Sequence, residues 1–188
     1  MLSKEQGQGL LRLARQEIEE QLGMRPATAE GGDDDPALLE QRGVFVTLHK
    51  NKALRGCIGS LAAAEPLAEG IRRNAVNAAF HDSRFAPLTS AELPDLHIEI
   101  SILSEPQPLT YRDADDLIGQ LRPTIDGVIL HGPHGEQATF LPQVWQQLPA
   151  AELFLNHLCR KAELPEDAWR SGRLRVLTYQ VQSFEEPR

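Results

Sequence analysis

The residues best suited to chemistry lie in segment 54–59, which reads Leu-Arg-Gly-Cys-Ile-Gly. A thiol becomes nucleophilic when a nearby positive charge or a helix N-terminus lowers its pKa. Arg55 and Cys57 lie two residues apart, so on a regular strand their side chains point to the same face. This spacing predicts a site for a thiolate or an anionic ligand. The alternative is that Cys57 is a small core side chain, because free cysteines are among the most buried residues.

The two glycines of this segment allow a structural and a functional interpretation. Glycine inside a strand adds no packing and often marks a bulge or a place where another group approaches the backbone. Gly56 and Gly59 therefore mark a bulge and a strand exit, or they expose backbone N–H groups to an anion. We include Ile58, which lies between them, among the residues expected to line the site. A phosphate-binding loop is not expected, since no Lys-Ser/Thr pair and no GxGxxG pattern is present.

Three charged residues farther along the chain are further candidates for this site. Asp82 and Arg84 lie on a predicted loop, where they form a structural ion pair or act as an acid, a base or a ligand clamp. Glu99 lies on the polar face of a predicted strand. A buried carboxylate needs a partner, and Arg55 or Arg84 would suit it.

Metal ligands are not expected. His131 and His134 lie on a predicted hairpin loop without a third ligand nearby. The acidic run within the turn-rich loop 24–35 is typical of a solvated, flexible loop that also caps the next helix. We therefore expect neither a metal nor a cofactor.

The elements that must position these residues follow from the periodicity of the apolar side chains. Strand 44–48, the polar turn 49–52 and the returning segment 54–59 predict a β-hairpin. Strict alternation in 96–103 predicts a strand with one polar face. Strand 96–103 is expected to stop before Pro106 and Pro108. Helical spacing, caps and breakers predict the other elements: helices 4–22, 36–41, 65–80, 113–121 and 151–162, a hairpin of strands 127–131 and 138–141, and a last strand 173–184.

Composition limits the class of protein. The chain has 188 residues, 41% of them hydrophobic, which fits a single domain over 1–188 with a real core. Its net charge of −8 disfavours general binding to the nucleic-acid backbone. Two distant cysteines, the polar N-terminus and the lack of a long apolar run predict a cytoplasmic protein that does not bind membranes. The mixture of helices and hairpins predicts an α+β fold, with a mostly antiparallel sheet flanked by helices.

Several longer motifs follow one another along the chain: segments 45–48 (FVTL), 54–59 (LRGCIG), 79–85 (AFHDSRF), 87–88 (PL), 98–101 (IEIS), 126–127 (DG), 139–145 (TFLPQVW), 154–155 (FL), 158–159 (LC) and 161–162 (KA). Taken in order, these motifs resemble the AMMECR family, the component called protein A of the AmmeMemoRadiSam system. The resemblance covers about residues 36–185.

This resemblance implies an α+β fold with a larger part and a smaller subdomain beside a cleft, which segment 54–59 borders. It also implies two partners, a metalloprotein resembling extradiol dioxygenases and a radical-SAM enzyme. No molecular activity comes with it, and it identifies no small molecule. Two hypotheses stay open: an accessory or binding protein with its ligand or partner site at segment 54–59, or an enzyme that uses Cys57 as nucleophile while Arg55 stabilises charge.

Overall fold

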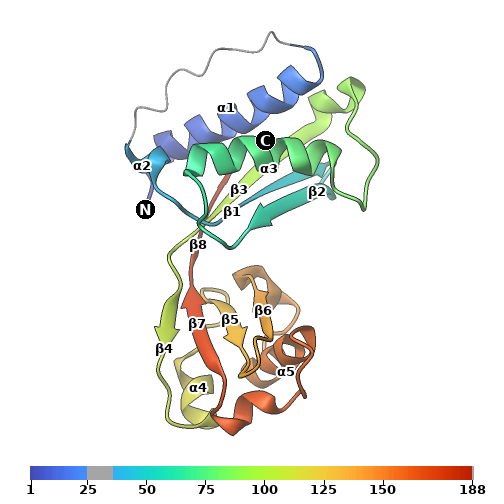
Figure 1. Ribbon diagram of the computed structural model, residues 1–188. Coiled ribbons are helices and arrows are strands. Elements are labelled where there is room, and N and C mark those ends of the chain that lie inside the picture. Colours follow the sequence, from blue (N-terminus) through green and yellow to red (C-terminus); the bar gives the residue numbers. More distant parts are fainter. Residues whose placement is uncertain (25–35, 188) are drawn as a thin grey trace. The chain divides into compact units, whose positions relative to one another are not determined.

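The computed structural model describes residues 1–24 and 36–187, so the acidic run expected in a solvated loop lies outside the described residues. The chain divides into two compact units (Figure 1). Unit 1 comprises Met1–Leu103 together with Gln182–Arg188, and unit 2 comprises Ser104–Val181. All the candidate residues of segment 54–59 and of positions 82, 84 and 99 belong to unit 1.

Unit 1 is built on a four-stranded sheet in the order β2-β1-β3-β8. Strand β1 pairs antiparallel with both β2 and β3, so β2 forms an edge of the sheet. The predicted hairpin is confirmed, and its turn contains Asn51 and Lys52 with positive φ angles. The bounds are β1 (Val44–Lys50), β2 (Ala53–Ser60), β3 (Leu96–Leu103) and β8 (Val181–Glu185).

Helices α1 and α3 lie on the same side of this sheet (Figure 1). Val46, Leu48 and Ile98 point into the core that the helices cover, and all three are fully buried. The alternating side chains of β1 and β3 point to the opposite face, which we call the outer face. The helices are α1 (Lys4–Gln21), which begins with the capping box of Ser3 and Gln6, α2 (Pro36–Leu39), α3 (Leu67–Phe80) and the 3-10 helix η1 (Ser90–Asp95).

Unit 2 is built on a second four-stranded sheet, in the order β4-β7-β5-β6. Its core contains Trp145, which stacks on Phe154 with ring centroids 3.8 Å apart. The indole N–H of Trp145 donates to the Asp126 carbonyl at 2.7 Å. The bounds are β4 (Gln107–Leu109), α4 (Ala114–Gln120), β5 (Gly127–His131), β6 (Gln137–Phe140), η2 (Pro142–Gln146), α5 (Ala151–Lys161), η3 (Ala168–Ser171) and β7 (Arg175–Tyr179).

The α+β class is confirmed, with two corrections to the elements. The last predicted strand, 173–184, is two strands: β7 pairs with β4 and β5, whereas β8 joins the sheet of unit 1. Gln180 separates them, because its backbone hydrogen-bonds to Ser104 instead. Strand β4 was not expected, since Pro106 and Pro108 were read as a stop. It lies at a sheet edge, where proline is tolerated.

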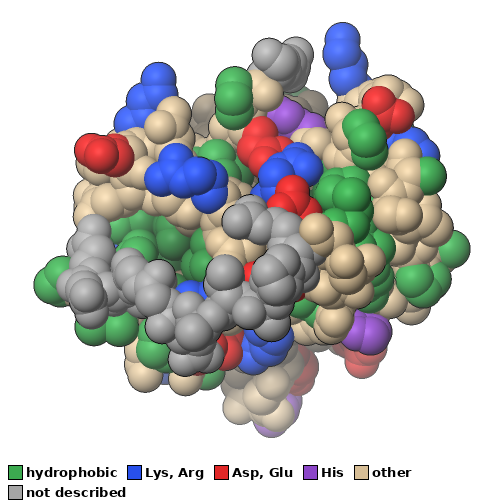
Figure 2. All heavy atoms as spheres, turned by 90° about the horizontal axis from the view of Figure 1, so that it is seen from above, with side chains coloured by type: hydrophobic (Ala, Val, Ile, Leu, Met, Phe, Trp, Pro, Cys, Tyr) green, Lys and Arg blue, Asp and Glu red, His purple; other side chains and the backbone are tan. Residues whose placement is uncertain are grey.

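Charges of both signs mix on the surface seen in Figure 2. Among the described residues on this side, basic side chains lie next to acidic ones and form no continuous basic patch. Opposite charges also pair between the helices of unit 1, where Arg72 binds Glu17 at 2.8 Å. In the described part of the chain, no helix has the length and apolar character needed to cross a bilayer.

Candidate functional site

Close packing on both sides explains the glycines of β2. A Cβ atom on Gly56 would lie 2.1 Å from the carbonyl oxygen of Ala78, so the backbone of α3 packs directly on β2. A Cβ atom on Gly59 would lie 2.4 Å from the ring of Phe45. The two glycines therefore allow the close approach of neighbouring groups of the fold.

The predicted bulge is present, and it changes the position of Arg55. Leu48 pairs with Gly56, and His49 pairs with Leu54. Arg55 is therefore the extra residue of the bulge, where the regular alternation of strand side chains is interrupted. The spacing argument that placed Arg55 beside Cys57 on one face does not apply at such a position.

Asp82 and Arg84 hold the backbone of Cys57. The Cys57 N–H donates to Asp82 Oδ2 at 2.9 Å, and Arg84 Nη2 donates to the Cys57 carbonyl at 3.2 Å. Arg84 also donates to both carboxylate oxygens of Asp82, at 2.9 and 2.6 Å. The structural ion pair is thus confirmed. It provides hydrogen-bond partners for the N–H and C=O of Cys57, which point away from the sheet on an edge strand and would otherwise be unpaired. We call these three residues the edge clamp.

The edge clamp keeps its charges fixed. The hydrogen bond from Arg84, helped by the backbone N–H groups of Cys57 and Arg84, holds the pKa of Asp82 far below its usual range despite burial. The same ion pair raises the pKa of Arg84, and the negative charge of a Cys57 thiolate adds a smaller contribution. Asp82 therefore remains a carboxylate at neutral pH and is unsuited to donating a proton.

Arg55 is paired with Glu92. Its Nε donates to Glu92 Oε1 at 3.0 Å and its Nη2 to Glu92 Oε2 at 3.2 Å, while Nη2 also donates to the Ala86 carbonyl at 2.9 Å. Lys50 Nζ joins the same carboxylate at 3.1 Å. The expected pairing of Glu99 with Arg55 or Arg84 is therefore wrong, because each arginine already has another carboxylate.

Sequence reasoning missed Glu92, although a local signal was available. Thr89 and Glu92 have the spacing of a capping box, and Glu92 Oε2 accepts from both the N–H and the hydroxyl of Thr89. The hydrogen bond from Arg55, followed by those from Thr89 and Lys50, holds the pKa of Glu92 far below its usual range. Glu92 thus fixes the loop after α3 against β2.

The side chain of Cys57 lies on the outer face. It is half-buried, and the Thr47 hydroxyl donates to its Sγ at 3.3 Å. The registers place Cys57 opposite Thr47, and Thr47 opposite Glu99, so these three residues form a row across β2, β1 and β3. Cys159, by contrast, is fully buried in unit 2, and burial raises the pKa of its thiol.

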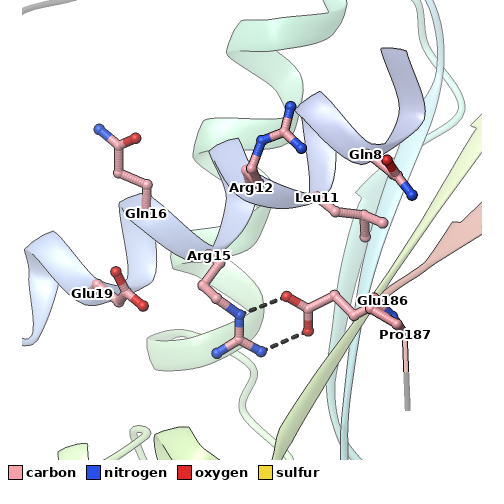
Figure 3. Close-up of a pocket in the computed structure, with 8 residues that line it drawn as sticks. All are labelled: Gln8, Leu11, Arg12, Arg15, Gln16, Glu19, Glu186 and Pro187. Atoms are coloured by element: carbon pink, nitrogen blue, oxygen red, sulfur yellow. Dashed lines mark hydrogen bonds and ion pairs between the residues drawn. The ribbon is translucent and has the colours of Figure 1, made fainter. Parts of the chain in front are cut away.

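A separate cavity of about 610 Å³ lies between α1 and the C-terminal segment (Figure 3). Its floor is occupied by an ion pair, since Arg15 donates to both oxygens of Glu186 at 2.5 and 2.6 Å. Glu186 Oε2 also accepts from the Ile98 N–H at 2.9 Å. Figure 3 shows Arg12 and Gln16 pointing away from this pair. The arrangement anchors the C-terminal segment to α1 and to β3.

The described residues contain no group of three or more His, Cys, Asp or Glu side chains arranged to hold a metal ion. His131 is the last residue of β5, and His134 lies within the turn between β5 and β6. Burial lowers the pKa of His131, with a smaller contribution from Arg175.

Comparisons with known proteins agree with this architecture. The family model AMMECR1 matches residues 11–184. A protein from Thermofilum pendens is 38% identical, over 98% of this chain and 92% of its own, and one from Methanothermobacter thermautotrophicus is 36% identical, over 98% and 96%. The crystal structure of an uncharacterized protein from Pyrococcus horikoshii superposes with a TM-score of 0.84 at 34% identity, covering 98% of this chain and 93% of that chain.

Proposed function

Because this chain belongs to the AMMECR1 family, we propose that it is an accessory binding protein whose recognition site is the outer face beside Cys57. Its partners in this proposal are a metalloprotein resembling extradiol dioxygenases and a radical-SAM enzyme. The recognition site comprises the row of Cys57, Thr47 and Glu99. Segment 54–59 contributes Cys57 to this row and places it on β2, at the edge of the sheet.

One observation carries the proposal: Arg55, Asp82 and Arg84, which sequence analysis offered as chemically active groups, are all engaged in holding segment 54–59. Arg55 is bound by Glu92, and Asp82 and Arg84 bind each other and the Cys57 backbone. Groups held this firmly are poor candidates for proton transfer, but they pre-organise the strand. A pre-organised surface loses less conformational entropy on binding, which favours affinity.

The test measures binding of the full chain to each purified partner from the same genome by biolayer interferometry. Thr47→Tyr places a large side chain in the middle of the row, and we expect it to weaken binding by at least about tenfold, as a misfit at an interface centre does. His134→Tyr in unit 2 is the matched control and should bind as the wild type does. Failure of both partners to bind, or unchanged binding of Thr47→Tyr, contradicts the proposal.

A cysteine-dependent enzyme is the second candidate, and the surroundings of Sγ favour it. The Thr47 hydroxyl donates to the sulfur, and the positive charge of Arg84 interacts with a Cys57 thiolate. In this version Arg84 takes the role first given to Arg55. A hydrogen-bond donor and a nearby guanidinium are the kinds of neighbour found around reactive cysteines.

Alkylation by iodoacetamide separates the two candidates. For an enzyme, Cys57 in the Cys159→Ser variant should react with a pH midpoint well below the value of about 8.5 for a free thiol. Arg84→Gln should shift that midpoint upward. A pH midpoint at or above that of a free thiol contradicts a nucleophilic role for Cys57. The accessory function requires only that the Cys57→Ser variant still binds the partners.

A further inference from the structure

A second hollow on the outer face of unit 1 lies next to the row of Cys57, Thr47 and Glu99. The cavity has a volume of about 300 Å³ and is lined by five polar side chains from three strands and one turn. His49 of β1 is directly opposite His97 of β3. The lining residues are His49, Lys52, His97, Glu99 and Glu185.

Two of the five lining residues already interact with each other. His97 Nε2 lies 3.4 Å from Glu185 Oε2. The side chains of His49, Lys52 and Glu99 have no hydrogen-bond or ion-pair partner within residues 1–24 and 36–187. Glu99 is also only half-exposed.

This pattern differs from that of three other carboxylates of unit 1 that are buried or partly buried. Asp82, Glu92 and Glu186 each hold an arginine, with side chains 4%, 17% and 15% exposed. A partly buried carboxylate without a partner is costly. An unpaired carboxylate, an unpaired ammonium and an unpaired imidazole that line one cavity are therefore better explained by a ligand than by stability of the fold.

We propose that this cavity binds a small zwitterion, an α-amino acid or a molecule of similar size that carries both an ammonium and a carboxylate. Lys52 and the His49 ring bind the carboxylate, and Glu99 binds the ammonium. The volume lies at the lower end of the range for small-molecule cavities, which suits a ligand of this size. The inference concerns a small molecule and does not depend on the proposed protein partners.

The balance of charge selects this class. A simple anion would be attracted by Lys52 but repelled by the carboxylates of Glu99 and Glu185. A simple amine would be attracted by these carboxylates but repelled by Lys52. A ligand with both charges pairs each of them with its opposite, and charged hydrogen bonds are stronger than neutral ones. Divalent metal is disfavoured because no three donors converge here among the described residues.

The test uses the full chain and the standard amino acids as probes, with saturation-transfer NMR to detect binding and calorimetry to measure it. We expect at least one amino acid to bind at millimolar concentration or better. Its N-acetyl derivative and its carboxamide should each bind at least about tenfold more weakly, because each lacks one charge. A derivative that binds as well as the parent overturns the zwitterion assignment.

Two variants test the residues. Glu99→Gln and Lys52→Met should each weaken binding of that amino acid at least about tenfold. Glu5→Gln and Lys4→Met make the same chemical changes on α1 and should leave binding unchanged. Unchanged binding by Glu99→Gln, or no binding of any amino acid to the wild type, overturns the proposal. Where a site variant does not fold, the derivative series on the wild type decides.

The cavity and the proposed recognition row share Glu99, but the two proposals are tested by different measurements and are therefore separable. Amino-acid binding without partner binding supports the cavity alone. Partner binding without amino-acid binding supports the accessory function alone and refutes the cavity assignment.

Discussion

The carboxylate of Asp82 accepts a hydrogen bond from the backbone N–H of Cys57 at 2.9 Å, although 25 residues separate them in the chain. Arg84 completes the contact by binding both the carboxylate and the Cys57 carbonyl. An edge strand is thereby closed by side chains instead of by another strand. The position of the thiol depends on this edge clamp, and so do the first two predictions.

Removal of the clamp carboxylate should destabilise unit 1. Asp82→Ala leaves the Cys57 N–H and the Arg84 guanidinium without their partner, so we expect a loss of about 3 kcal/mol in the free energy of unfolding. Urea unfolding measures it. The control is Glu152→Gln, which removes an exposed ion pair with Arg170 and should cost less than about 1 kcal/mol. Equal effects of the two substitutions would contradict a structural role for Asp82.

Acid should weaken the clamp in a defined direction. The pKa of Asp82 is lowered in the folded state, chiefly by the hydrogen bond from Arg84, relative to an ordinary value of about 4 in the unfolded chain. Its contribution to stability is therefore fully present above about pH 4 and declines as the pH falls further. Unfolding free energies measured from pH 6 to pH 2 should fall more steeply for the wild type than for Asp82→Asn. Parallel curves would show that Asp82 is not the group responsible.

The close approach of α3 and β2 should make Gly56 intolerant of any side chain. Gly56→Ala places a methyl group 2.1 Å from the carbonyl oxygen of Ala78, and we expect it to cost about 3 kcal/mol. Gly119→Ala is the matched control, because nothing lies within 4 Å of a Cβ there and the position is in α4. That variant should gain about 0.5 kcal/mol from helix propensity. Thermal unfolding compares the two, and a neutral Gly56→Ala would contradict the packing.

The tyrosines of unit 2 should resist ionisation. Burial raises the pKa of Tyr179 to about 12, against a smaller opposing effect of its hydrogen bond with Thr139, and burial also raises the pKa of Tyr111. The chain has two tyrosines, so the folded protein should show no phenolate absorbance transition near pH 10. Because the folded pKa of Tyr179 is raised, its contribution to stability is present below about pH 10 and is lost as the pH rises through 12. A spectrophotometric titration in buffer and in urea checks this, and Tyr179→Phe should remove the later transition.

Local patterns in the chain predicted most elements of the fold. Apolar alternation in 96–103 predicts β3 and its polar face, and Ser3 predicts the start of α1, because each signal depends only on nearby residues. The last strand was predicted as one element, since its residues have strand character throughout. Its division between two sheets depends on which distant strands are available as partners, and no local pattern contains that information.

The sequence by itself determined the α+β class, the hairpin that carries Cys57 and the family resemblance, and it offered the Asp82–Arg84 ion pair as one of two alternatives. These follow from short-range spacing and from motifs that lie in one order along the chain. Only the tertiary structure decided that Arg55 binds Glu92, 37 residues away, and that Glu99 faces a cavity instead of an arginine. The physical reason is that a single bulge redirected Arg55, and that charged side chains pair with whichever partner the long-range packing brings within hydrogen-bond distance.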